Sequence, residues 1–477
     1  MLDFPQKKYL PFIFLFLIVF ISRLPFLDAG YGVEEDSWGI ALAAFHSKIL
    51  GVYEPSRLPG HPFQEIIYSA LWGSGCYVFN GLCALFSAIG ALFFALILKH
   101  LQFKQYLLAA VALAFIPVYF ISSTYTIDFV WTQALILIAL YCLLKNKFIV
   151  CGIFIGLAIG CRITSGVMLI PFMIVCWQSD WKENGLRFLK IAIPMSIVAI
   201  FLFVPVIQIF GFSFFMYYDQ FPYPPFAKVV YKMTIGVFGL IGFLSICFFA
   251  MNAIINRKKQ QIGEGFQNQL SVKIILASFV IILLYIISYF RLPQKSGYMI
   301  PLLPFIILLF GYYLNKRNFT LLCVSLVTSS FLFSINLTDT FRGSTHSKYA
   351  LVFKISNQEL FLDPFSGPVF SDYSKRKQKI KFTEQVIQKA NAVSTKTVII
   401  AGWWFNEILV TTIGETNNKM VIYEPYISEK KIKEYLEKKY EIYYLPEQNK
   451  YNDLMYKMNV TDEYARSFFK VENLNTW

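Results

Sequence analysis

Long apolar runs dominate the first two thirds of the chain. Many are long enough to cross about 30 Å of hydrocarbon. We predict membrane helices over residues 9–27, 68–98, 106–123, 129–144, 188–210, 229–255, 272–290, 298–314 and 319–336. The stretch 148–177 is longer than one span, and Arg162 interrupts it together with Thr164 and Ser165. Two short helices that meet at Arg162 fit this pattern better than one long helix, which gives about eleven crossings.

Basic residues between the apolar runs predict the orientation of the chain. We place the N-terminus, with Lys7 and Lys8, in the cytoplasm. Further basic clusters then fall in alternate gaps: Lys99 and Lys104; Lys145 and Lys147; Lys182, Arg187 and Lys190; Arg257, Lys258 and Lys259; Lys316 and Arg317. All of these basic clusters lie on the same side of the membrane only if the stretch 148–177 crosses it twice. The pattern predicts a multi-pass protein of the plasma or inner membrane, with its C-terminal tail exoplasmic.

The tail differs in composition from the rest of the chain. Residues 1–339 hold 23 Lys and Arg and 13 Asp and Glu, whereas residues 340–477 hold 20 and 16. The tail therefore has the charge content of a soluble domain. Residues 396–401 and 441–445 are predicted strands, and 428–439 is a predicted charged helix. We predict a transmembrane domain over 1–338 and a small soluble α/β domain over 339–477.

Composition excludes some classes of function. The chain is 56% hydrophobic and 15% charged, with a formal charge of +14. A positive charge can indicate nucleic-acid binding, but here most basic residues of the first part lie in short gaps between apolar runs, as in a membrane protein. We therefore predict membrane lipids and no nucleic acid as partners. All eight cysteines lie in or beside apolar runs, and no spacing predicts a metal site.

The charged residues of the predicted outer gaps are the candidate chemistry. The acidic ones are Glu34, Glu35, Asp36, Glu54, Glu65, Asp128 and Asp219. The basic and titratable ones are Arg57, His61, Arg162, Lys228, Arg291 and Lys295. Because the cytoplasmic gaps hold little but basic residues, we expect any concave site on the outer face. Residues 36–50 predict an amphipathic helix that lies flat on that surface and begins at Asp36.

Each of these residues has a structural interpretation beside the functional one. Arg162 lies between two apolar half-helices and needs an anionic partner, which is either Asp128 or the phosphate of a lipid. Arg291 is either a surface anchor or a phosphate ligand. The acidic loop is either solvated, with Asp36 as a helix cap, or it supplies a carboxylate that takes a proton while cations hold a phosphate.

An acidic first outer loop followed by a flat helix resembles the GT-C membrane glycosyltransferases. The closest resemblance is to the protein O-mannosyltransferase and aminoarabinose-transferase type (glycosyltransferase family 39 and relatives). The matching segments are Glu34-Glu35-Asp36-Ser37, YEPSRLPGHP at 53–62, TID at 126–128, GLAIGCRITS at 156–165, and Arg291-Leu-Pro with Tyr298-Met-Ile-Pro. They span most of residues 1–335, and the tail shows no likeness. The family's Asp-Glu pair reads Glu34-Glu35-Asp36 here, which leaves the choice of base among these three open.

The resemblance implies a sugar donor on a polyprenyl (undecaprenyl or dolichyl) phosphate. A hexosyl or pentosyl group would pass, with inversion, to a hydroxyl of a lipid, glycan or protein acceptor of the cell envelope. The expected catalytic residues are Asp36 and Glu35, with Asp36 preferred as general base because the helix it begins constrains it and keeps it ionised. The expected substrate-binding residues are Glu34, Arg57, His61, Asp128, Arg162, Lys228, Arg291, Lys295 and Tyr298. No cofactor is required, although the site could accommodate a divalent metal.

Two other functions compete with this one. A transporter or flippase of lipid-linked sugars usually has charges at the bilayer midplane and two related halves. Here the predicted spans are nearly free of charge except at Arg162, and the sequence has no internal repeat. A non-enzymatic membrane scaffold that displays the outer lobe would leave Arg162 and Arg291 unexplained.

Overall fold

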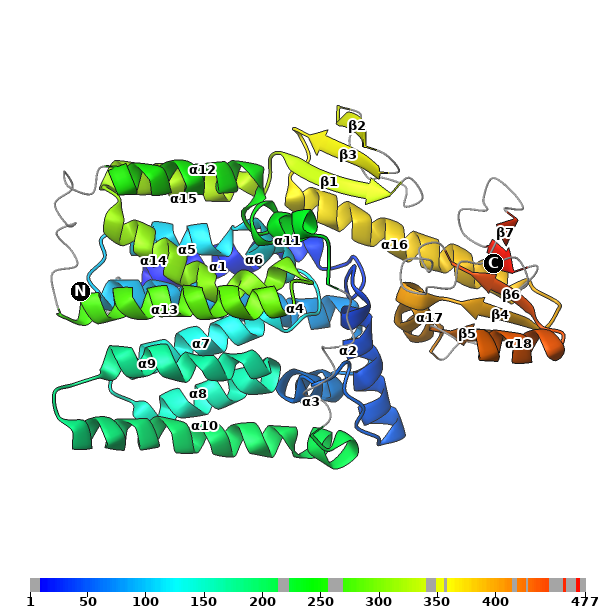
Figure 1. Cartoon of the computed structure of the whole chain (residues 1–477), viewed down its shortest axis with the longest axis horizontal. Helices are drawn as coiled ribbons and strands as arrows, with labels where there is room; N and C mark the ends of the chain where they lie inside the picture. Colours follow the sequence, from blue (N-terminus) through cyan, green and yellow to red (C-terminus); the bar gives the residue numbers. More distant parts are fainter. Residues whose placement is uncertain are drawn as a thin grey trace, which may run out of the picture.

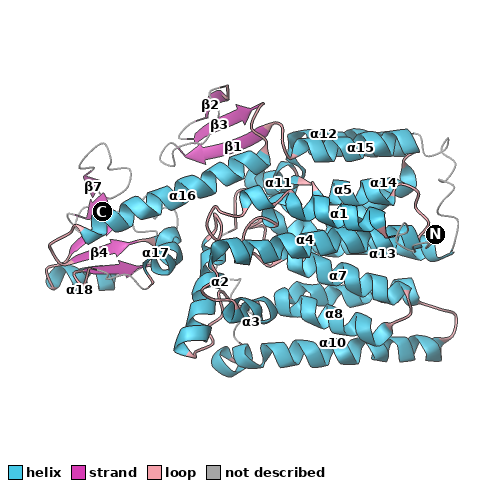
Figure 2. Ribbon diagram, turned by 180° about the vertical axis from the view of Figure 1, so that it is seen from behind, coloured by secondary structure: helices cyan, strands magenta, loops and turns pink. Residues whose placement is uncertain are grey.

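The computed structural model is a bundle of long helices with a mixed α/β lobe at one end (Figure 1). It describes residues 9–212, 223–255, 269–339, 349–355, 358–413, 418–425, 428–445, 458–459 and 469–471. The bundle helices run side by side, and the view from behind shows the lobe at the same end (Figure 2). Asp219, one of the predicted outer residues, lies outside the described residues.

Every predicted span contains at least one helix. The bundle consists of α1 (Leu10–Ile21), α4 (Gly75–His100), α5 (Tyr106–Ala114), α6 (Pro117–Ser122), α7 (Phe129–Leu144), α8 (Phe148–Cys161), α9 (Leu169–Cys176), α10 (Trp181–Phe210), α11 (Phe226–Met233), α12 (Ile235–Ile255), α13 (Gln269–Arg291), α14 (Leu303–Tyr313) and α15 (Lys316–Ser329). Short 3₁₀ helices cover Leu24–Phe26, Ile163–Met168 and Ser296–Leu302. As predicted, the stretch 148–177 is divided, because the backbone becomes extended at Arg162.

Some boundaries differ from the predicted ones. The span predicted at 68–98 is two helices, because the chain turns after α3 (Pro62–Ala70) and α4 begins only at Gly75. Pro117 begins a new helix within the span predicted at 106–123, since proline cannot donate the backbone hydrogen bond that would continue α5. The last predicted span, 319–336, ends as a helix at Ser329 and continues as a strand.

Within the described part of the chain, five segments are long and apolar enough to cross a membrane: Gly75–His100, Trp181–Phe210, Ile235–Ile255, Val272–Arg291 and Ser296–Tyr313. Their outward surfaces are apolar too. On α10, for example, Ile197 and Phe201 are 63% and 76% exposed. A helix that is apolar on its exposed face as well as its packed face is suited to lipid rather than to water.

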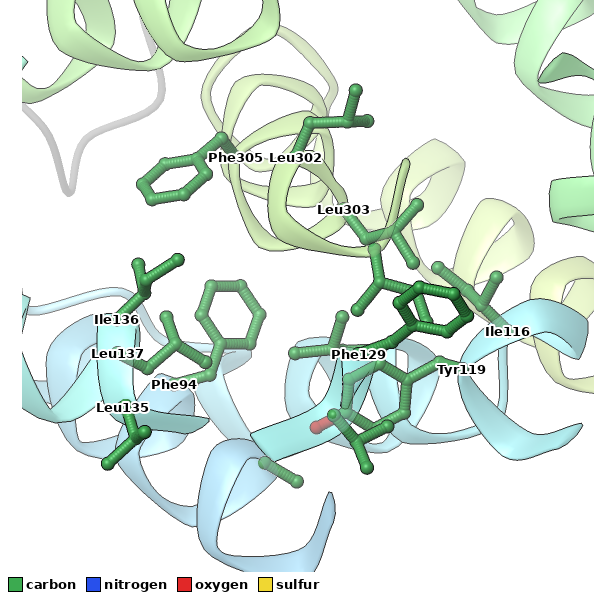
Figure 3. Close-up of a cluster of buried hydrophobic side chains, with 14 of the residues drawn as sticks. Phe94, Ile116, Tyr119, Phe129, Leu135, Ile136, Leu137, Leu302, Leu303 and Phe305 are labelled. Carbon is green, nitrogen blue, oxygen red and sulfur yellow. The ribbon is translucent and has the colours of Figure 1, made fainter. Parts of the chain in front are cut away.

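Small residues allow the central helices to approach closely. Gly152 and Gly156 of α8 face α10, and a Cβ atom on Gly152 would lie 2.2 Å from the carbonyl oxygen of Ile191. Such small residues are common where membrane helices pack. Figure 3 shows the centre of the bundle, where Phe129 and Tyr119 lie beside Leu303.

The two ends of α1 identify the two ends of the bundle. The Phe12 ring stacks on Tyr106, which follows the basic gap at Lys99 and Lys104. The Phe26 ring, past the other end of α1, contacts Tyr373 of the lobe at a centroid distance of 5.5 Å. The start of α1 and the lobe therefore lie at opposite ends.

The predicted flat helix is α2 (Glu35–Phe45), which crosses the lobe end of the bundle (Figure 1). It starts one residue before the predicted position. Residues His46–Leu50 form a π-helical turn rather than a continuation of α2, and Gly51 ends it in the left-handed conformation that glycine favours. Trp38, Ile40 and Ala41 are buried.

The lobe contains two sheets. The first consists of β1 (Ser334–Asp339), β2 (Leu351–Ile355) and β3 (Gln358–Asp363), antiparallel in the order β1-β3-β2. The long helix α16 (Pro368–Asn391) leads to the second, with β4 (Thr397–Ile400), α17 (Phe405–Thr412), β5 (Val421–Glu424), α18 (Glu429–Glu437), β6 (Glu441–Tyr444), β7 (Met458–Asn459) and β8 (Phe469–Val471), in strand order β5-β4-β6-β8-β7. The elements β4, α18 and β6 match the predictions. The boundary predicted at residue 338 falls inside β1.

Candidate functional site

Seven charged or titratable residues meet at the lobe end of the bundle. They come from the start of α2, the Pro-rich turn before α3, the residue before α7, the junction after α8, and the residue before the 3₁₀ helix Ser296–Leu302. We call them the charged cluster: Glu34, Asp36, Arg57, His61, Asp128, Arg162 and Lys295. The sequence-predicted outer residues from five separate segments are thus brought together.

Arg57 is at the centre of the charged cluster. Its Nη1 donates a hydrogen bond to Asp36 Oδ2, and its Nη2 donates one to Asp128 Oδ1 at 3.1 Å. Its Nε donates to His61 Nε2 at 2.8 Å. A planar guanidinium suits this role because its donors point in fixed, divergent directions.

A buried carboxyl group holds the turn that carries Arg57. Glu65 accepts hydrogen bonds from the Tyr53 hydroxyl at 2.6 Å and from the backbone N–H and hydroxyl of Ser56 at 2.8 and 2.7 Å. Glu65 is 2% exposed, and this burial raises its pKa. The sequence placed Glu65 among the outer acidic residues but assigned it no role.

Asp128 is the anionic partner of Arg162. Arg162 Nη1 donates to Asp128 Oδ2 at 2.7 Å, which is the protein-carboxylate alternative raised by the sequence. Burial alone would raise the pKa of Asp128, but Arg162, His61 and Arg57 outweigh it and the pKa lies below its usual value. The Arg162 guanidinium also lies over the Tyr298 ring at 4.5 Å and the Phe129 ring at 4.9 Å.

His61 is neutral in this environment. Its Nδ1 is hydrogen-bonded to the carbonyl oxygen of Cys161, so Nδ1 carries the proton and Nε2 accepts from Arg57. Burial, with the nearby arginines, lowers the pKa of His61 to about 4. At neutral pH the ring therefore positions Arg57 rather than acting as an acid.

Lys295 joins the acidic loop to the late outer loop. Its ammonium group contacts both Glu34 Oε2 and Asp36 Oδ2. Burial would raise the pKa of Glu34, but Lys295, Arg57 and Lys232 together lower it. Asp36 makes these ion pairs and no cap hydrogen bond with α2.

Lys232 is a further cation that the sequence analysis missed. The predicted span 229–255 placed it inside the membrane, but α11 ends at Met233 and a separate helix, α12, begins at Ile235. Lys232 donates to the backbone carbonyl of Gln294, next to Lys295. Burial and the neighbouring Lys228 lower its pKa to about 8. The Tyr-Pro-Pro sequence at 223–225, just before α11, was the available sign of a separate element.

Glu35 lies within electrostatic reach of both the lobe and the charged cluster. Burial raises its pKa, while Lys379 of α16 and Lys295 oppose this effect. Lys379 donates to the backbone carbonyl of Val33 at 2.8 Å and pairs with Glu407 at 2.9 Å. The lobe therefore contacts the acidic loop directly.

Lys228 and Arg291, the two other predicted cations, are exposed, on α11 and at the end of α13. Among the residues that the structure describes, no three His, Cys, Asp or Glu side chains are grouped as metal ligands would be.

No protein-family model matches the sequence, and no curated protein matches it. Two crystal structures of ArnT from Cupriavidus metallidurans do match, one bound to undecaprenyl phosphate and one in the apo state. Each has a TM-score of 0.53 and covers 98% of both chains, at 12% and 10% sequence identity. The chain has the GT-C fold. The match confirms the predicted GT-C fold, and it extends over the tail, where the sequence showed no resemblance.

The site contains cations that can serve as partners of an anion. Glu34, Asp36 and Asp128 supply three negative charges. Arg57, Arg162 and Lys295 balance them, and the nearby Lys232 adds a fourth cation at neutral pH. A phosphate can therefore bind with cations on one side and a carboxylate on the other.

Proposed function

We propose that this chain is a membrane glycosyltransferase that transfers a sugar from a polyprenyl-phosphate carrier to an acceptor hydroxyl. The reaction takes place at the lobe end of the bundle, which is the exoplasmic face. The observation that carries the proposal is the charged cluster, in which a constrained carboxylate lies beside lysine and arginine side chains at one end of a GT-C fold. That an ArnT crystal structure holds undecaprenyl phosphate supports a carrier of this class.

The cations hold the carrier phosphate. Lys295 and Lys232 lie on adjoining elements beside Asp36, so a phosphate can take the place of a carboxylate as the partner of Lys295. Arg162 stays paired with Asp128, and its guanidinium group lies over the Tyr298 ring. The exposed Arg291 and Lys228 attract the headgroup from outside. These fixed cations stabilise the charge that the phosphate gains as it leaves.

Asp36 acts as the general base. It accepts the proton of the acceptor hydroxyl while the hydroxyl oxygen forms a bond to the anomeric carbon. The bond from that carbon to the phosphate oxygen breaks, and its electron pair leaves with the polyprenyl phosphate. One displacement inverts the anomeric centre. The start of α2, Arg57 and Lys295 hold Asp36 in place, and a base must be fixed within hydrogen-bond reach of its proton. Glu35, the residue before Asp36 in α2, has a supporting role.

The proposal is tested with purified protein and a polyprenyl phosphate that carries a labelled sugar. We expect Asp36→Asn and Asp36→Ser to lower the transfer rate by about 10²–10⁴-fold, because the base is lost. Glu35→Gln should have a smaller effect. Glu54→Gln is the control, since Glu54 pairs with His46 on the surface and takes no part in the charged cluster. Near-parent transfer rates for both Asp36 variants would contradict the assignment of Asp36 as the base. Label that crosses vesicles without release of polyprenyl phosphate would contradict transfer and favour a flippase.

The predicted face has its own test. A cysteine introduced at Lys433, on α18 of the lobe, should react with a membrane-impermeant maleimide added outside intact cells. A cysteine at Lys316, in a basic gap at the opposite end, should react only after the cells are opened. The opposite result would place the charged cluster in the cytoplasm.

A further inference from the structure

The first sheet of the lobe is attached to the end of the bundle where the last helices stop. β1 begins at Ser334, shortly after α15 ends at Ser329. The Tyr231 hydroxyl of α11 donates to the backbone carbonyl of Ile335 at 2.7 Å, and β1 also contacts α12. Figure 1 shows the sheet beside the ends of α12 and α15. The start of β1 therefore lies at the level where the bundle leaves the membrane.

The strand register gives this sheet one apolar face. Ile335 pairs with Leu362, which also pairs with Leu351, so these three side chains form the row nearest the bundle. Phe353 and Leu360 pair in a row farther out on the same face. Paired residues of neighbouring strands point to the same side, and every second residue along a strand does so too.

The other face of the sheet is the covered one. Phe361 is 1% exposed and Asp363 is buried, and α16 lies against this part of the sheet. Val352 pairs with Phe361 and so points away from the face that carries Leu351. The sheet is thus packed on one side, while its apolar side is open.

An exposed apolar patch forms where the open face meets the bundle. It consists of Leu332, Phe333, Tyr349, Leu351 and Phe365, which we call the sheet-edge patch; all five are exposed. The Tyr349 and Phe365 rings contact edge to face, with centroids 5.4 Å apart. These residues lie just before β1, at or just before the start of β2, and just after β3. They are therefore grouped at one end of the strands.

The sheet-edge patch continues the lipid-facing surface of α15. Leu321 and Val324 of that helix are exposed, and Leu332 and Phe333 follow its C-terminal end directly. A contiguous apolar patch of this kind is unfavourable in water and is usually covered. Continuity with the bilayer-facing helices indicates that lipid covers it.

We propose that the sheet-edge patch inserts into the interfacial layer of the leaflet on the lobe side. Its aromatic and aliphatic composition matches that of a membrane interface. Inserted in this way, the sheet fixes the height of α16 and the lobe above the charged cluster. This inference depends on the membrane fold and not on the transfer reaction.

The test compares two neighbouring positions on β2. Leu351→Cys and Val352→Cys are made in a Cys247→Ser background, because Cys247 is the exposed native cysteine among the residues described. Each is labelled with the environment-sensitive fluorophore NBD and placed in vesicles of phosphatidylcholine and phosphatidylglycerol. Fluorescence is quenched either by lipids brominated on the acyl chains or by iodide in the water. Phe365→Cys is the second test variant in case Leu351→Cys does not fold.

We expect the label at residue 351 to be quenched by brominated lipid and protected from iodide. The label at residue 352 should show the reverse, since its side chain leaves the opposite face. Equal iodide quenching at both positions, without quenching by brominated lipid, would overturn the proposal. Protection from iodide that depends on protein concentration and occurs without brominated-lipid quenching would also overturn it, in favour of a second copy of the chain on this surface.

Discussion

Arg57 shows how one side chain can organise a site assembled from distant parts of the chain. Its three donors reach Asp36, Asp128 and His61, which lie on three different segments. A lysine could not replace it, because an ammonium group lacks the planar arrangement of donors. His61 has its pKa lowered to about 4 and accepts from Arg57 as a neutral ring, so the contact adds no repulsive charge.

The sequence could predict these residues but not their pairing. An unpaired charge beside apolar segments has a high desolvation cost, so Asp128 and Arg162 are candidates from the sequence alone. In the structure they form an ion pair. The ion pair between Asp128 and Arg162 depends on how α7 packs against α8, and the spacing of apolar residues in the sequence does not specify that packing. Lys232 was missed for a different reason, because hydropathy averaged over a window merges α11 with α12.

The proposed role of Lys232 predicts that donor binding depends on pH. Its pKa is lowered to about 8, so the ammonium form is present at neutral pH and is lost as pH rises through about 8. We therefore expect kcat/KM for the lipid donor to fall between about pH 7 and pH 9, since kcat/KM reports groups of the free enzyme. Lys232→Arg should remove this descent, because arginine stays protonated. If kcat/KM falls over the same pH range in Lys232→Arg, another group must cause the pH dependence.

At the scale of elements, the break at Arg162 and the flat helix α2 place the charged cluster at one end of the bundle. Both were predictable, since the run 148–177 is too long for one span and apolar residues recur at helical spacing in 36–50. In the structure, however, α2 is buried on most sides and not on one face alone. α16 was not predicted. Its residues Pro368–Asn391 carry many charges and no strong apolar stripe, and burial of Val386 and Ile387 against the second sheet stabilises it instead.

Close packing of α8 on α10 predicts a specific sensitivity at Gly152. A methyl group there would meet the Ile191 carbonyl oxygen, so the two helices must separate. We expect Gly152→Ala to destabilise the protein by about 1–3 kcal/mol, the usual cost of overpacking. Gly81→Ala in α4 is the matched control, because nothing lies within 4 Å of its added methyl group. Thermal unfolding in detergent measures both, and equal midpoints would mean that the α8–α10 contact adjusts without cost.

At the scale of the whole molecule, the lobe and the bundle are joined through the site. Arg376 of α16 is 1% exposed and donates to the carbonyl oxygen of Thr124 at 2.9 Å and to its hydroxyl at 3.0 Å. It also donates to the carbonyl oxygen of Phe26 at 3.2 Å and to Asp372 at 2.9 Å. Thr124 begins the loop that ends at Asp128. α16 therefore supports the loop that positions both arginines of the charged cluster.

Removal of this connection should affect catalysis as well as stability. Arg376→Met leaves the oxygens of Thr124 and of the partly buried Asp372 without their donor. Breaking a fully buried charged pair costs about 3–5 kcal/mol, so we expect a smaller loss of stability here. We expect kcat to fall and protease cleavage of α16 to become faster, whereas Arg376→Lys should recover part of both. Lys381→Met is the control on the same helix, because Lys381 is exposed.

The two readouts separate a role in the site from a role in folding alone. If α16 only stabilises the lobe, a ligand or low temperature that restores the folded population should restore kcat as well. If α16 positions the Thr124 loop, the folded Arg376→Met protein should retain a lower kcat, because Asp128 no longer holds Arg57 in place for Asp36. Full activity in folded Arg376→Met protein would show that the bundle positions the charged cluster without the lobe.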